Sequence, residues 1–124
     1  MRFLIALVCL TNPALAQDWF MREGDRMLED SALLDRLRGQ VLTFFDDGQA
    51  TFYEDDRYSY SYDGGQGGTA YGHYKLGEDG SLCIDFVNGA SRCDRYVLNT
   101  GRLILVTENH LRFPVRSEDL APAD

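Results

Sequence analysis

The densest group of residues with ligand-binding potential is a run of tyrosines. In Tyr58-Ser59-Tyr60-Ser61-Tyr62 the alternation predicts a strand with three phenol rings on one face and two serines on the other. Facing a cavity, such rings would hold a flat apolar or sugar-like molecule; facing a core, they would pack the wall of a sheet with their hydroxyls at the rim. A second aromatic strand follows a Gly-rich loop, so the candidate ligand-binding residues are Tyr58, Tyr60, Tyr62, Tyr71, His73 and Tyr74.

Two cysteines are predicted to form a disulfide. If residues 87–89 form a three-residue hairpin loop with Gly89 at positive φ, Phe86 faces Ala90 and Cys83 lies directly opposite Cys93. A two-residue loop would place the two sulfur atoms on opposite faces of the hairpin. No CxxC motif is present, so we interpret the pair as a structural crosslink.

The same register puts charge on an apolar face. Arg92 and Asp94 would share the side of the hairpin that carries the apolar residues of the first strand. Either a bulge intervenes or one of the two charges lies at the rim. The apolar residues are Leu82, Ile84 and Phe86.

Catalytic, metal and cofactor motifs do not emerge from the sequence. His73 and His110 have no second His or Cys at metal-ligand spacing, and the acids at 46–47 and 54–56 are typical of solvated turns. The Gly-rich loop over 64–68 lacks the Lys, the Ser or Thr and the helix of a phosphate loop. We therefore predict no catalytic residue, no metal and no cofactor.

Export is predicted from the first sixteen residues. Arg2, the apolar run 3–10 and the small-x-small triplet Ala14-Leu15-Ala16 form a secretory signal peptide cleaved after Ala16. Eight apolar residues are too short to span a bilayer, and Val8 before Cys9 is not a lipobox residue. We expect a bacterial periplasmic or secreted protein without membrane insertion after cleavage, in a compartment that oxidises Cys83 and Cys93.

The net charge of the chain limits the classes of binding partner that we expect. The 124 residues carry a formal charge of −8, from 12 basic and 20 acidic side chains, which disfavours nucleic acid. Loss of the single Arg in residues 1–16 leaves 108 residues at −9. One small domain is therefore expected over 17–116, with Trp19 and Phe20 packed on its body and a flexible polar tail over 117–124.

One helix is expected at the start of this domain. Ala32, Leu33, Leu34 and Leu37 form an apolar stripe, Asp30 or Ser31 is a cap, and Gly39 is the residue after the helix. Met27 and Leu28 extend the stripe, so we place the helix at about 25–38, packed on a sheet.

From Gln40 the apolar period changes to two and turn residues recur at short intervals, which is typical of an antiparallel meander. About eight strands must hide their edges, so the predicted fold is mainly β, a small up-and-down barrel or a strongly curled sheet with the helix on it. Gly72 fits a sharp bend. The expected strands are Val41–Phe45, Ala50–Tyr53, Tyr58–Tyr62, Thr69–Leu76, Ser81–Val87, Arg92–Leu98, Arg102–Thr107 and Leu111–Val115.

The segment Gly68–Tyr74, followed by Ser81-Leu82-Cys83 and Ser91-Arg92-Cys93, resembles small exported alphaproteobacterial proteins of unknown function. The resemblance covers about residues 33–106, with Gly72-His73-Tyr74 where that family shows Gly-x-Trp. It implies export, a β-rich fold and a cysteine pair, and it carries no activity.

Several functions fit these features. The first is a non-enzymatic, calycin-like binding module that holds an apolar or aromatic small molecule on the tyrosine-rich face. An acidic inhibitor that binds a basic periplasmic protein, similar to periplasmic lysozyme inhibitors, is the alternative, and a ligand-free envelope accessory protein is another. Gly68 and Tyr71 match only the Gly and Tyr spacing of the inhibitor motif.

Overall fold

The computed structural model describes residues 21–123 and consists of nine strands, one α-helix and a short 3-10 turn. The elements are β1 (Asp25–Leu28), α1 (Asp30–Leu37), β2 (Gln40–Phe44), β3 (Gln49–Phe52), β4 (Arg57–Ser61), η2 (Asp63–Gly65), β5 (Thr69–Leu76), β6 (Leu82–Phe86), β7 (Ser91–Asn99), β8 (Arg102–Val106) and β9 (Arg112–Leu120).

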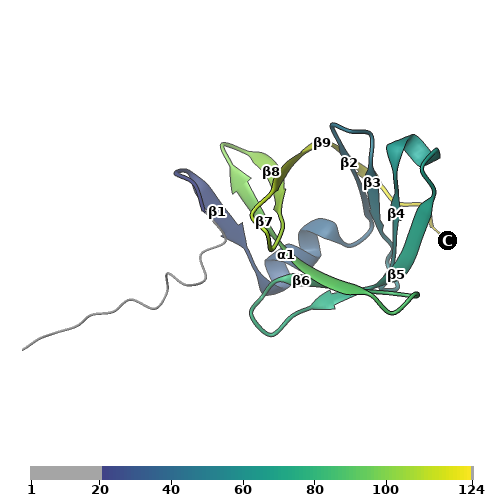
Figure 1. Ribbon diagram of the computed structural model, residues 1–124. Coiled ribbons are helices and arrows are strands. Elements are labelled where there is room, and N and C mark those ends of the chain that lie inside the picture. Colours follow the sequence, from purple (N-terminus) through teal and green to yellow (C-terminus); the bar gives the residue numbers. More distant parts are fainter. Residues whose placement is uncertain (1–20, 124) are drawn as a thin grey trace, which may run out of the picture.

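The eight strands β2 to β9 form a closed ring (Figure 1). Each pairs antiparallel with its neighbours in sequence, and β2 pairs with β9 to close the circle. The predicted up-and-down barrel is confirmed. Closure satisfies the backbone groups that an open sheet would leave at its edges. The ninth strand, β1, pairs with β7 outside the ring.

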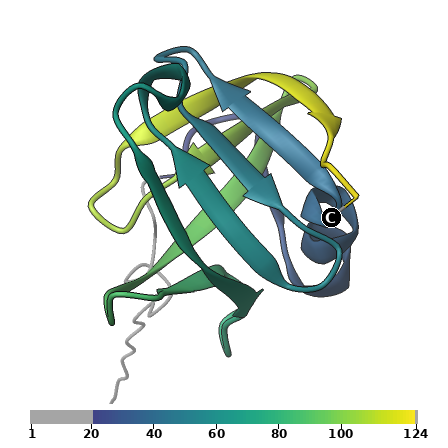
Figure 2. The same cartoon turned by 90° about the vertical axis from the view of Figure 1, so that its right-hand side faces the viewer.

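Helix α1 closes one end of the barrel (Figures 1 and 2). Leu33 and Leu37, one turn apart, are fully buried in the barrel core. Gly39 follows with φ of 81°, and its N–H donates to the carbonyl of Phe52 at 2.7 Å. The helix therefore ends where β2 begins, and its apolar stripe fills the base of the barrel.

The expected helix start near Asp25 is wrong. Residues 25–28 form β1, and Glu29 is extended before the helix begins at Asp30. Met27 packs with a small apolar cluster on the outside of the barrel, whereas Leu28 packs against the main core. Successive side chains of a strand point to opposite faces. Both apolar side chains can therefore be buried, one on each face of β1, without a helix.

The flexible tail expected over 117–124 is also wrong for most of its length. Strand β9 extends to Leu120, which pairs with Gln40, and Ala121 donates its N–H to the carbonyl of Gly39 at 2.8 Å. Glu118 accepts two hydrogen bonds of 3.0 Å from Arg36 of α1. The end of β9 is held by backbone hydrogen bonds to β2 and not by buried apolar side chains. Its sequence therefore lacks the apolar alternation that would have predicted a strand.

The hairpin of β6 and β7 has the predicted register. Cys83 lies opposite Cys93, their Cα atoms are 3.9 Å apart, and the two sulfur atoms are bonded. The loop closes through Phe86 and Ala90, with Gly89 at φ of 95°. The three-residue loop and the disulfide are therefore confirmed in the structure.

Gly72 sits where two strands approach closely. A Cβ atom at this position would lie 2.4 Å from the backbone oxygen of Asp85. Only glycine allows β5 and β6 to curl together so tightly, as the prediction of a sharp bend required.

The predicted signal peptide over 1–16, its cleavage after Ala16 and the packing of Trp19 and Phe20 lie outside the described residues. Between residues 21 and 123, no helix is long and apolar enough to cross a membrane.

Candidate functional site

The end of the barrel opposite α1 contains a cavity of about 170 Å³. Its walls come from strands on both sides of the ring, because alternate residues near the ends of β2, β4, β7, β8 and β9 face inward there. We call this cavity the mouth cavity. It is lined by Phe44, Asp46, Tyr60, Tyr62, Arg92, Leu105, Thr107 and Phe113.

Aromatic rings form one wall of the mouth cavity. The ring centroid of Tyr60 lies 6.4 Å from that of Phe44 and 4.8 Å from that of Tyr62, the latter pair meeting edge to face. Burial raises the pKa of the Tyr60 hydroxyl, and the nearby Asp46 carboxylate raises it further. Tyr62 is half exposed at the entrance. The wall is thus apolar with an uncharged hydroxyl, which suits an aromatic or apolar guest.

Arg92 lines the opposite side of the cavity and is paired with a buried carboxylate. Arg92 and Asp94 are two residues apart on β7 and face the interior, and Arg92 Nε donates to Asp94 Oδ2 at 2.9 Å. The side chain of Asp94 is 3% exposed and that of Arg92 is 41% exposed. The pairing of β6 with β7 is regular, so no bulge intervenes; Arg92 lies at the rim and Asp94 one step deeper.

The environment shifts the pKa of both partners. Burial raises the pKa of the Asp94 carboxyl, and the hydrogen bond from Arg92 only partly offsets this. For Arg92, burial opposes the charge, yet attraction to the Asp94 carboxylate raises the pKa of the guanidinium. Arg92 is therefore a permanent cation at the inner edge of the mouth.

A second hollow of about 350 Å³ adjoins the mouth cavity and shares Arg92 and Thr107 with it. Arg92 consequently stands between two spaces. The other lining residues are Cys93, Asp94, Glu108 and Asn109.

Two predicted ligand-binding tyrosines belong to the core. Tyr58 is 2% exposed, with its ring edge-to-face against Phe52 at a centroid distance of 5.1 Å. Burial raises the pKa of its hydroxyl well above the usual range. Tyr74 also packs edge-to-face on Phe52, at 5.2 Å. Both rings therefore fill the barrel between the mouth cavity and α1.

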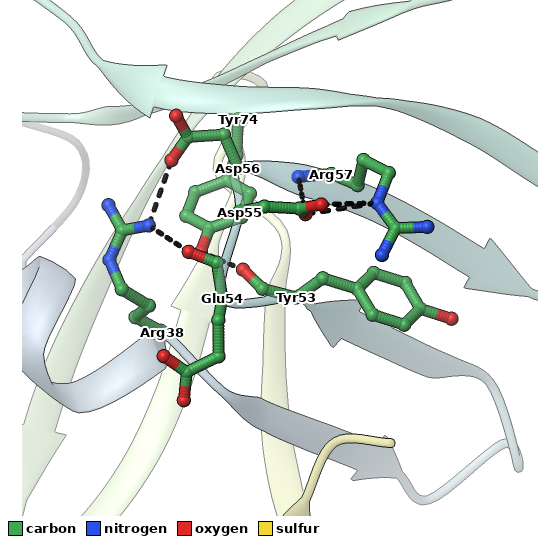
Figure 3. A network of polar contacts seen from close by, with 7 residues as sticks. All are labelled: Arg38, Tyr53, Glu54, Asp55, Asp56, Arg57 and Tyr74. Carbon is green, nitrogen blue, oxygen red and sulfur yellow. Dashed lines mark hydrogen bonds and ion pairs between the residues drawn. The ribbon is translucent and has the colours of Figure 1, made fainter. Parts of the chain in front are cut away.

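The hydroxyl of Tyr74 is part of a polar network at the α1 end of the barrel (Figure 3). It donates to the carbonyl oxygen of Tyr53, and the guanidinium of Arg38 lies 5.3 Å from the ring centroid. Arg38 Nη1 in turn donates to the carbonyl of Glu54 at 2.9 Å and to Asp56 at 2.8 Å. Burial raises the pKa of Tyr74 to about 12. This network joins α1 to the turn between β3 and β4, which is a structural role.

Tyr71 and His73 point to the outside of the barrel. Tyr71 pairs with Ser59, and His73 pairs with Arg57, on the face opposite to the core tyrosines. Both line an outer hollow of about 220 Å³. The six predicted residues therefore do not form one site: Tyr58 joins Tyr71 and His73 in the lining of this outer hollow. Tyr60 and Tyr62 line the mouth cavity.

Sequence reasoning missed most of the other lining residues. Leu105 and Phe113 lie opposite each other in the β8–β9 hairpin, and Phe44 joins them when β2 pairs with β9 to close the ring. Arg92 had left a signal, because the hairpin register placed it, together with Asp94, on an otherwise apolar face. An inward-facing arginine in a strand is therefore the feature by which this site could have been found.

In the part of the chain that the structure describes, no group of three or more His, Cys, Asp or Glu residues could hold a metal ion. Comparison with models of protein families, with curated proteins and with solved structures found no match.

Proposed function

We propose that this protein is an exported, non-enzymatic binding module that holds a small apolar or aromatic molecule in the mouth cavity. The observation that supports this most directly is the composition of the cavity wall. Aromatic rings from the ends of β2, β4 and β9 line a space at the end of the barrel opposite α1. Apolar concave sites with a few polar groups are the usual form of small-molecule sites.

The size of the cavity limits the ligand. Drug-sized ligands occupy pockets of roughly 300–1,000 Å³, whereas the mouth cavity measures about 170 Å³. We infer a ligand with a single ring inside the cavity, and any further part of it extends past Arg92 into the adjoining hollow. Of the six ligand-binding residues predicted from the sequence, the proposed site in the mouth cavity contains Tyr60 and Tyr62.

Export rests on two features. Residues 1–16 have the pattern of a cleavable signal, and the Cys83–Cys93 disulfide requires an oxidising compartment to persist. A periplasmic or secreted binding module meets its ligand outside the reducing cytoplasm.

The proposal is tested by titrating the purified, ¹⁵N-labelled protein with toluene and with benzamide. We expect amide shifts at Tyr62, Thr107 and Phe113 for at least one probe. Phe113→Ala removes part of the wall and should weaken binding about fivefold. Phe45→Ala is the matched control, since Phe45 is exposed at the same end of the barrel and does not line the mouth cavity.

Shifts that gather instead around Tyr71 and His73 would place the site in the outer hollow. If neither probe shifts the mouth residues at millimolar concentration, the binding proposal is wrong. The acidic protein-binding inhibitor then becomes the better explanation, and loss of lysozyme activity at micromolar protein would support it. Unchanged lysozyme activity would leave the ligand-free accessory role.

A further inference from the structure

The guanidinium of Arg92 has hydrogen-bond donors that its bond to Asp94 does not use. Its Nε is engaged with Asp94, and among residues 21–123 the two Nη groups donate to no protein acceptor. The side chain lines both the mouth cavity and the adjoining hollow. Each Nη group can therefore donate a hydrogen bond to a guest in either space.

The charge around these donors is not positive. Among the described residues that line the two spaces, Arg92 is the one cation, whereas Asp46, Asp94 and Glu108 are acids. The chain as a whole carries −8. An anionic guest would lose its hydration to meet a guanidinium whose charge Asp94 already balances at 2.9 Å.

An uncharged acceptor avoids this penalty. A carbonyl oxygen takes a charge-assisted hydrogen bond from Arg92 and brings no charge toward the three carboxylates. Its ring can rest against Tyr60 and Phe44 at the same time.

We propose that the mouth cavity recognises uncharged planar aromatic molecules bearing a carbonyl-type acceptor, which accepts a hydrogen bond from the Nη groups of Arg92. This inference rests on the proposed binding function and specifies its ligand class. Asp94 is the positioning residue: it holds Arg92 against the wall and sets the preference for an uncharged guest.

The test compares three probes of similar shape in ¹⁵N chemical-shift titrations at pH 7: benzamide, benzoate and toluene. For the native protein we expect benzamide to bind about tenfold more tightly than either of the others. Asp94→Asn keeps the shape of the side chain and removes its charge. This variant should bind benzoate at least as tightly as benzamide, because Arg92 then presents a net positive charge.

Arg92→Gln alone would leave the buried Asp94 carboxylate without its partner, so the donor is removed in the double variant Arg92→Gln/Asp94→Asn. There benzamide affinity should fall to that of toluene. Arg116→Gln is the matched control, because Arg116 lies on β9, pairs with Asp47 at 3.1 Å and does not line the mouth cavity. It should leave all three affinities unchanged.

Tighter binding of benzoate than of benzamide to the native protein overturns the inference, as does benzamide affinity that survives in the double variant. In either case binding at the mouth still supports the proposed function. If none of the three probes shifts the mouth residues, the proposed function and the inference fail together.

Discussion

At the scale of single residues, two ion pairs show how hydrogen bonds and depth of burial together set the pKa of a carboxylate. The side chain of Asp25 in β1 is shielded from solvent and accepts hydrogen bonds from two Nη groups of Arg112, from the Arg22 N–H and from Asn99. These bonds, led by those from Arg112, lower its pKa to about 2 despite burial. Asp94 lies deeper in the protein and has a single bond of this kind, from Arg92, so burial raises its pKa.

Asp25 should therefore contribute to acid unfolding. Its folded pKa of about 2 lies below the value of about 4 in an unfolded chain. The stability that it contributes is complete above about pH 4 and is lost as the pH falls from about 4 to about 2. In urea unfolding across this range, Asp25→Asn should lower the free energy of unfolding at pH 7 and flatten its decline with acid.

The control is Asp55→Asn. Hydrogen bonds from Arg57 also lower the pKa of Asp55, but that pair is exposed to solvent and should count for little. An Asp25→Asn protein with the native pH slope would contradict the assignment. Asp94 acts in the opposite sense, since its raised pKa lets the folded state take up a proton before the unfolded state does.

At the scale of elements, the β6–β7 hairpin links the disulfide to the site. The register that sets Cys83 against Cys93 also sets Ile84 against Arg92 and Leu82 against Asp94. Cysteines point to one face of the hairpin, and the ion pair points to the other. The crosslink therefore holds the strand that presents Arg92 to the mouth cavity.

Removing the crosslink should cost about 3 kcal/mol in the free energy of unfolding, because it closes a short loop in the unfolded chain. The variant is Cys83→Ala/Cys93→Ala, whose parent cysteines are 10 positions apart. Denaturant unfolding of the native protein with and without a thiol reductant should show the same loss. Addition of the reductant to the variant is the control and should change nothing; a native protein insensitive to reduction would contradict the prediction.

At the scale of the whole molecule, closure of the ring depends on its last strand. The pairing of β9 with β2 and β8 joins the end of the described chain to the first ring strand. Without that pairing the barrel would be an open sheet with two edges. The mouth cavity needs it as well, since Phe113 belongs to β9.

A chain that ends at Ser117 should lose at least about 2 kcal/mol of stability, because several backbone hydrogen bonds to β2 and the Arg36–Glu118 pair disappear. A chain that ends at Pro122 keeps β9 and should match the native protein in thermal unfolding. Glu118→Gln separates the two causes, and the loss of this partly exposed pair should cost less than about 1 kcal/mol. Native stability in the shorter chain would show that the end of β9 is dispensable.

Much of the barrel could be predicted because its rules are local. Alternation along 58–62, turn residues at regular spacing and a three-residue loop before Ala90 each depend on neighbours within one hairpin. Those same rules gave the correct opposition of Cys83 and Cys93. An ambiguous local pattern gave a wrong prediction at the helix start. Met27 and Leu28 fit the apolar stripe of a helix, yet they face opposite sides of a strand.

The amino-acid sequence by itself indicated a mainly β fold, most of the strands and their antiparallel order, and a disulfide register that depended on a three-residue loop. The choice between a closed barrel and a strongly curled sheet came from the tertiary structure. Only the tertiary structure decided that β9 runs to Leu120 and that Tyr58 and Tyr74 are core while Tyr71 is outside. It also brought Phe44, Leu105 and Phe113 around Arg92. The physical reason is that alternation assigns residues to two faces, but which face becomes the interior, and how deep each residue lies in it, depends on where distant strands close the ring.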